Sequence, residues 1–139
     1  MAEKQRPLHK RDGDELLGFL IPFAQQCLAK HGEFHPFAAC VTAGGKVEAI
    51  SAEPADVETF VRALTAGARD KRYRATGLCQ NMRITDPRSR QETDAIVVSF
   101  DHAQGEAIDC IVPYKKAKRG YEYGELLATR GETRIFGRR

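Results

Sequence analysis

Two runs of alternating apolar residues, 95–100 and 107–112, constrain the fold of this chain more than any other feature. The apolar positions two apart in these runs are Ile96, Val98, Phe100, Ile108, Cys110 and Val112. Residues two apart on a strand point to the same face, so each run predicts a strand with one apolar face. Gln104-Gly105 separates the runs and is typical of a turn. An antiparallel hairpin with one buried face follows.

Two further segments have the periodicity of amphipathic helices. The first is expected to begin at Asp12 or Asp14, to kink at Pro22 and to end before Gly32. Its apolar face consists of Leu16, Leu20, Phe23 and Cys27. The second is expected to open near Pro54 and to end near Gly67. Its apolar stripe consists of Val57, Phe60, Val61 and Leu64.

The remaining strands complete an α+β order. Short strands are expected at 37–42 and 46–51, another at 78–84, and the 121–136 tail adds a last strand or packs irregularly. The order α-β-β-α-β-β-β(-β) predicts a single, mainly antiparallel sheet with two helices packed on it. Profilin-like and roadblock-like domains share this order. We assign residues 13–139 to this domain and residues 1–12 to a flexible N-terminal arm.

Composition restricts the setting and the partners. The 139 residues fit one domain, and 22 basic against 19 acidic residues give a net charge of +3, which is modest for a dedicated nucleic-acid binder. The chain shows no secretory segment and no apolar run of membrane-spanning length. Its four cysteines lie far apart and form no C-x-x-C pair. We therefore expect a cytoplasmic protein with reduced thiols, without a membrane partner and without a cofactor.

Three short segments resemble those of a group of small bacterial proteins of unknown function. They are Gly32-Glu33-Phe34-His35-Pro36-Phe37-Ala38, Thr93-Asp94-Ala95-Ile96 and Tyr123-Gly124-Glu125-Leu126. The resemblance spans about Asp14 to Phe136. It implies a bacterial cytosolic protein of similar architecture, and it brings no activity and no site residue with it.

Cys79, His102 and Asp94 are the candidate catalytic residues, as a nucleophile, a base and a carboxylate in one cleft. The alternative is that Cys79 is a buried structural thiol, like Cys40 and Cys110. Other carboxylates to inspect for a raised pKa are Asp109 and Glu125, and Asp101 also lies beside a central strand. A solvated sheet face would equally explain these carboxylates.

Two other groups suggest binding chemistry. His31, Glu33 and His35 are candidate metal ligands, but Gly32 and Pro36 interrupt any helix that would align them. A basic segment with interleaved tyrosines suits single-stranded nucleic acid through phosphate contacts and base stacking. Its residues are Lys115, Lys116, Lys118, Arg119, Tyr121 and Tyr123. A second basic cluster lies at 69–74 and two arginines end the chain; solvated charged loops are the alternative for both.

The leading hypothesis is a non-enzymatic protein-interaction module whose partner is another protein or a second copy of the chain. Its proposed contact is a free strand edge, supplied by 95–100 or 37–42. The two alternatives are the cleft around Cys79, His102 and Asp94, and nucleic-acid binding through 115–123.

Overall fold

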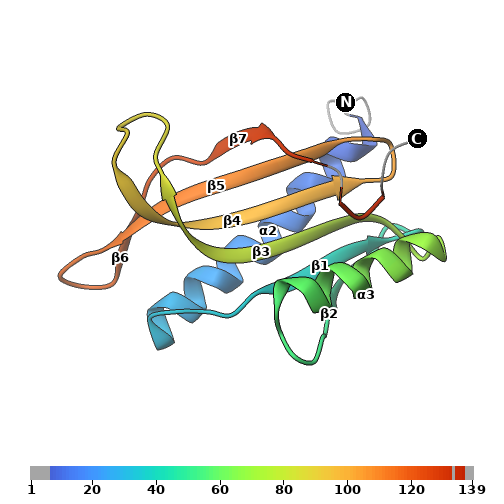
Figure 1. Ribbon diagram of the computed structural model, residues 1–139, viewed down its shortest axis with the longest axis horizontal. Helices are drawn as coiled ribbons and strands as arrows, with labels where there is room; N and C mark the ends of the chain where they lie inside the picture. Colours follow the sequence, from blue (N-terminus) through green and yellow to red (C-terminus); the bar gives the residue numbers. More distant parts are fainter. Residues whose placement is uncertain (1–6, 133, 137–139) are drawn as a thin grey trace.

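A seven-stranded antiparallel sheet forms the middle layer of the protein, with one helix on each face (Figure 1). The computed structural model describes residues 7–132 and 134–136. The strands are β1 (Phe37–Thr42), β2 (Val47–Ile50), β3 (Tyr73–Thr85), β4 (Glu92–His102), β5 (Ala107–Lys116), β6 (Tyr121–Tyr123) and β7 (Leu127–Arg130). The helices are α2 (Leu8–His31) and α3 (Val57–Arg69). This architecture confirms the α+β class and the predicted order of elements.

The sheet order is β2-β1-β3-β4-β5-β6, and β7 pairs with β5 along the half that β6 leaves open. In the β4–β5 hairpin, Ile96 lies opposite Val112 and Val98 opposite Cys110. These side chains face α2 in one core cluster, which confirms the apolar face predicted from the alternation. The free edges of the sheet are β2 on one side and β6 with β7 on the other. β1 and β4 lie inside the sheet, so the prediction that 37–42 or 95–100 supplies a free edge is wrong.

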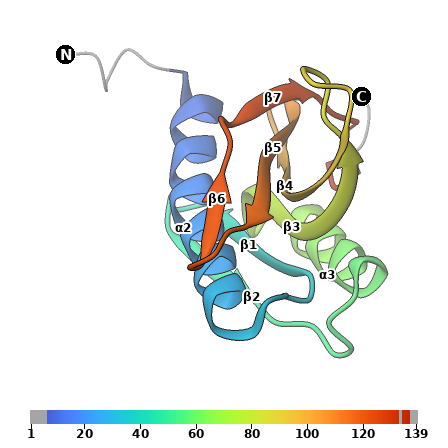
Figure 2. The same ribbon diagram turned by 90° about the vertical axis from the view of Figure 1, so that its left-hand side faces the viewer.

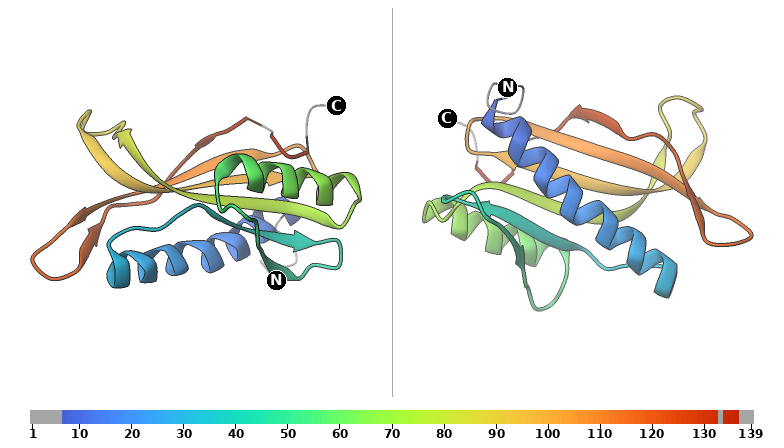
Figure 3. Two further views of the ribbon diagram at one scale, coloured as in Figure 1. Left: turned by 60° about the horizontal axis from the view of Figure 1, so that its bottom comes forward. Right: turned by 180° about the vertical axis from the view of Figure 1, so that it is seen from behind.

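Helix α2 covers the sheet face formed by β1, β3, β4 and β5 (Figure 3, right). Its buried positions recur every four residues, at Leu16, Leu20, Ala24 and Leu28. Gly77 on β3 allows close approach, because a Cβ there would lie 2.6 Å from a methyl carbon of Leu20. The helix begins at Leu8 rather than at Asp12 or Asp14, so residues 8–12 of the predicted arm are helical, and residues 1–6 of that arm lie outside the described residues. It continues through Pro22 and ends at Gly32, whose φ of 74° is the left-handed conformation of a helix C-cap.

Helix α3 packs on the opposite face, over β1 and β3 (Figure 3). The Asp56 carboxylate caps it by accepting a hydrogen bond of 2.8 Å from the Thr59 N–H. Its buried residues Phe60 and Leu64 pack on Leu78 of β3. The helix starts later than predicted, because Pro54 precedes the cap instead of occupying the first turn.

At the far end of the sheet the β3–β4 hairpin curls toward the α3 side, whereas the β5–β6 hairpin lies toward α2 (Figure 2). The tip of the β3–β4 hairpin meets the segment between β6 and β7, where Arg88 Nη1 donates to Glu125 Oε2 at 3.0 Å. No helix in the described part of the chain is long and apolar enough to cross a membrane.

Candidate functional site

The structure does not bring Cys79, His102 and Asp94 into one cleft. Asp94 and His102 lie eight positions apart on β4, a separation of about 26 Å at 3.3 Å per residue. The Asp94 carboxylate lies 3.3 Å from the Arg83 guanidinium, at the surface. Cys79 is fully buried beneath α2. The three residues therefore cannot act on one small substrate together.

The environments of Cys40, Cys79 and Cys110 keep these three thiols protonated at neutral pH. Burial raises the pKa of the Cys79 thiol far above its usual value. Burial likewise raises the pKa of Cys40 to about 11 and that of Cys110 to about 11. A thiol becomes a nucleophile only as the thiolate, so these three side chains act as small apolar residues at neutral pH.

His102 instead belongs to a buried charged network with Asp12 of α2 and Arg74 of β3. Asp12 Oδ2 lies 2.8 Å from His102 Nε2, and the two side chains are 3% and 1% exposed. Arg74 donates to both Asp12 oxygens, each at 2.9 Å. His102 Nδ1 accepts the Gln104 N–H at 3.0 Å, which leaves the ring proton on Nε2. Both ring nitrogens are occupied, so neither is free to serve as a general base.

Asp12 stays ionised in this network. Burial acts to raise the pKa of its carboxyl, but the hydrogen bonds and charges of Arg74 and His102 outweigh burial, and the pKa lies below its usual value. A buried carboxylate that accepts three hydrogen bonds is a structural tie between helix and sheet. Sequence reasoning did not find this network, because Asp12 and His102 lie 90 positions apart.

The candidate metal ligands His31, Glu33 and His35 lie exposed at the end of α2 and in the following loop. None of the three side chains makes a hydrogen bond or ion pair with another residue of 7–132 or 134–136. In those residues no group of three histidine, cysteine, aspartate or glutamate side chains is placed to hold a metal ion.

The basic segment 115–123 forms the end of β5, a turn and β6. Its four cationic residues are exposed, and Lys115 lies 3.7 Å from Glu122. The rings of Tyr121 and Tyr123 contact Tyr114, with centroids 5.7 and 6.2 Å away. These tyrosines extend the core under α2, so they do not form the open stacking platform that single-stranded nucleic acid needs.

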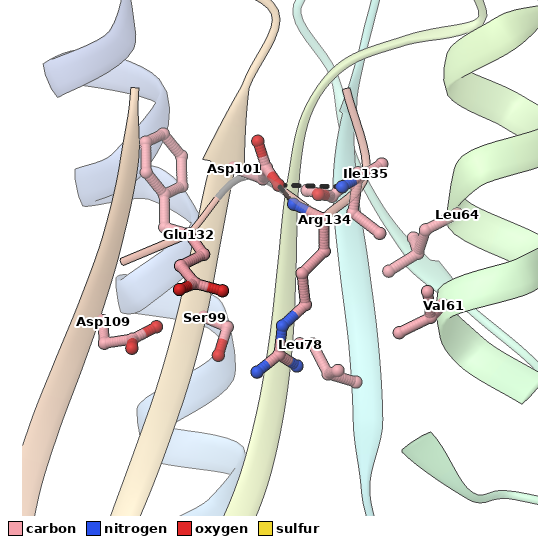
Figure 4. Close-up of a pocket in the computed structure, with 11 residues that line it drawn as sticks. Val61, Leu64, Leu78, Ser99, Asp101, Asp109, Glu132, Arg134 and Ile135 are labelled. Carbon is pink, nitrogen blue, oxygen red and sulfur yellow. Dashed lines mark hydrogen bonds between the residues drawn. The ribbon is translucent and has the colours of Figure 1, made fainter. Parts of the chain in front are cut away.

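A small cavity lined by both polar and apolar side chains lies on the α3 side, between β4, α3 and the segment 134–135, with Glu132 also lining it (Figure 4). Asp101 Oδ2 accepts the N–H groups of Arg134 and Ile135 at 2.7 and 2.9 Å, which fastens that segment to the sheet. Asp101 Oδ1 and the hydroxyl of Thr76 are buried without a partner among the described residues. Burial raises the pKa of the Asp101 carboxyl, against the two N–H groups that lower it. The cavity measures about 20 Å³, room for one water molecule and no substrate.

An aromatic surface lies where α2 meets β1, the strand next to the edge strand β2. Phe19 and Phe23 project from the flank of α2 and are 41% and 47% exposed. The ring of Phe23 packs edge-on against Phe37 of β1, with centroids 4.9 Å apart, and Phe37 packs against Phe34 at 5.6 Å. We call Phe19, Phe23, Phe34 and Phe37 the aromatic flank. Helical spacing placed Phe23 on the buried face, but the buried positions follow Leu20 and Ala24, so Phe23 faces sideways.

Comparison with protein-family models, with curated proteins and with solved structures gives no match. The candidate site therefore rests on geometry alone. The aromatic flank places two exposed aromatic side chains on the β1 side of α2, next to the edge strand β2.

Proposed function

We propose that this chain is a protein-interaction domain that binds a second copy of itself through β2 and the aromatic flank. The observation that supports it most is the exposed Phe19–Phe23 pair beside a free strand edge. A large aromatic side chain exposes roughly 80–100 Å² at such fractions, so burying each ring stabilises a complex by about 2 kcal/mol. Aromatic residues of this kind dominate the energy of protein interfaces.

The backbone of β2 provides the polar half of this surface. Thr42 N–H donates to Lys46 O at 2.8 Å, so Lys46 and Glu48 direct their backbone groups toward β1. By the alternation of an antiparallel ladder, the backbone groups of Val47 and Ala49 face away from the sheet. Val47 lies opposite Val41 of β1, so its side chain is on the α2 face, the same side as the aromatic flank. A strand added at this edge would meet hydrogen-bonding groups and aromatic rings together.

The charges on β2 favour a second copy as the added strand. In a two-fold antiparallel pairing centred on Val47, Lys46 of one copy lies opposite Glu48 of the other. Both charged pairs are then complementary, and each occupies a position of the ladder where cross-strand side chains are close. A strand that placed a basic residue opposite Lys46 and an acidic residue opposite Glu48 would be repelled. The two charges therefore favour a second copy of β2 as the partner.

Sedimentation equilibrium tests this proposal with one substitution in the aromatic flank, one in β2 and one control at a distant site. Phe23→Ser removes one ring from each copy and is expected to weaken dimerisation by roughly 1,000-fold, the equivalent of about 4 kcal/mol. Ala49→Pro is expected to prevent it, because proline removes an outward N–H while leaving the β1 ladder intact. Met82→Ser serves as the control, since Met82 is a comparably exposed apolar residue on the distant β3–β4 hairpin.

Thermal unfolding of each variant shows whether the monomer fold is retained. A folded Ala49→Pro variant that dimerises as tightly as the wild type would overturn the role of β2. Equal weakening by Phe23→Ser and Met82→Ser would overturn the role of the aromatic flank.

A further inference from the structure

A second basic cluster, at 69–74, lines a cavity of about 470 Å³ where α3 ends against the sheet. This volume lies within the range of ligand-binding cavities, about 300–1,000 Å³. The walls come from the end of α3, the start of β3, the loop that follows β4, and residues 135 and 136. These segments are far apart in the sequence, so the sequence alone did not show that the basic cluster lines a cavity.

The cavity carries positive charge that none of its described lining residues balances. Arg69, Lys71 and Arg74 line it, and no aspartate or glutamate is among its described lining residues. Arg74 is held by Asp12 on its other side. The side chains of Arg69 and Lys71 make no hydrogen bond or ion pair with any residue of 7–132 or 134–136. Two cationic groups are therefore available to a ligand.

The backbone at Lys71 supports a role for its side chain. Lys71 has a φ of 59°, a left-handed conformation that costs a residue with a side chain of order 1 kcal/mol or more. The position follows the end of α3, where glycine is the usual residue for this conformation. A lysine here keeps a cation at the cavity wall at the expense of local strain.

Aromatic side chains form the opposite part of the cavity. Tyr73 and Phe136 line it, together with the buried Ile135. Gly67 allows the Tyr73 ring to lie directly on the α3 backbone, because a Cβ at that position would come within 2.1 Å of the ring. The Arg72 guanidinium lies 5.5 Å from the centroid of the same ring. The ring is thus held in place, as a preformed binding surface requires.

We infer that this cavity binds a small aromatic phosphate monoester, with its phosphate at Arg69 and Lys71 and its ring against Tyr73 and Phe136. A phosphate monoester carries close to two negative charges at neutral pH, which matches the two unpaired cations better than a single carboxylate does. The volume also exceeds the need of inorganic phosphate alone. This site lies apart from the aromatic flank and does not depend on dimerisation.

Isothermal titration calorimetry with phenyl phosphate, benzoate and inorganic phosphate tests the inference. Phenyl phosphate is expected to bind at least tenfold more tightly than either of the other two. Arg69→Gln and Lys71→Gln are each expected to weaken it tenfold or more, whereas Phe136→Ala should weaken phenyl phosphate and leave inorganic phosphate unchanged.

Arg62→Gln is the matched control, because Arg62 lies on the same helix with an exposed partner, Glu58. Unchanged thermal unfolding verifies the fold of each variant. The inference is overturned if phenyl phosphate shows no saturable binding at low ionic strength. It is equally overturned if Arg62→Gln weakens binding as much as Lys71→Gln, since a diffuse surface charge would then suffice.

Discussion

Asp12 Oδ2 and His102 Nε2 lie 2.8 Å apart, although the two residues are 90 positions apart in the sequence. Asp12 is on the first turns of α2, and His102 ends β4. With Arg74 of β3 as the third member, the contact ties the start of the helix to two central strands. Removing one member of such a buried network leaves the others desolvated and unpaired.

Asp12→Ala is therefore expected to lower the free energy of unfolding by about 3–5 kcal/mol at neutral pH. Urea denaturation measures the loss. Glu15→Gln, at an exposed position on the same helix, is the control and should change stability by less than about 0.5 kcal/mol. If both variants lost the same small amount, the network would have no structural role.

Asp12 also predicts a loss of stability in acid. Its pKa in the folded state is lowered, so its contribution is fully present above the unfolded pKa, near the ordinary 3.8. The contribution disappears as the pH falls through the lower folded pKa. Urea midpoints between pH 2 and pH 6 should therefore fall more steeply in the wild type than in Asp12→Ala.

Asp101→Asn is expected to raise the stability of the protein at neutral pH, whereas Asp12→Ala lowers it. The pKa of Asp101 is raised by burial, so its contribution is present below the unfolded pKa and is lost as the pH rises through the folded pKa. An asparagine removes the buried charge while its oxygen still accepts the N–H groups of Arg134 and Ile135. The melting temperature of the variant should exceed that of the wild type at pH 7, with a smaller difference at pH 3. A lower melting temperature at pH 7 would contradict this account.

Substitution by alanine at two helical glycines is expected to change the stability of the protein in opposite directions. Gly67→Ala should destabilise the protein by about 1–3 kcal/mol, because the new Cβ meets the Tyr73 ring. Gly18→Ala should stabilise it by about 0.5–1 kcal/mol, since nothing lies within 4 Å and alanine favours helix. Thermal unfolding of both variants measures the two signs, and destabilisation by Gly18→Ala would contradict the packing of α2.

The cysteines are expected to react with Ellman's reagent in two classes. In the native protein only Cys27 is partly accessible, whereas Cys40, Cys79 and Cys110 are buried. One equivalent should react under native conditions and four after denaturation. Rapid modification of Cys79, identified by mass spectrometry, would contradict the burial of this thiol beneath α2.

The local patterns of the chain were predictable, and the long-range ones were not. Alternation placed β4, β5 and their α2 face correctly, and Gly32 marked the end of α2. Strand order cannot be read from alternation, which is why β1 and β4 were expected at an edge. β3 was predicted to start at Leu78 rather than Tyr73, since Arg74 does not look like a strand residue until its partner Asp12 is known.

The same holds for the candidate sites: local features were predictable from the sequence, and contacts between distant segments were not. The alternation of β3 could not decide whether Cys79 is a nucleophile or a buried structural thiol, because the strand is buried on both sides between Ala75 and Cys79, where α2 and α3 cover it, and is exposed beyond Gln80. The basic cluster at 69–74 was visible as charge, but its cavity depends on Phe136 and on the loop after β4. Contacts between distant segments of this kind leave no periodic signal in the sequence.

The most direct test of the proposed self-association is a charge exchange on β2, followed by sedimentation equilibrium across a concentration series. The wild type is expected to approach twice the 15.5 kDa of one chain. Lys46→Glu and Glu48→Lys should each shift the protein to the monomer, because like charges then face each other across the two-fold axis. The double variant should restore the dimer. A wild type that stays monomeric at every concentration, or a double variant no better than the single ones, would contradict the account.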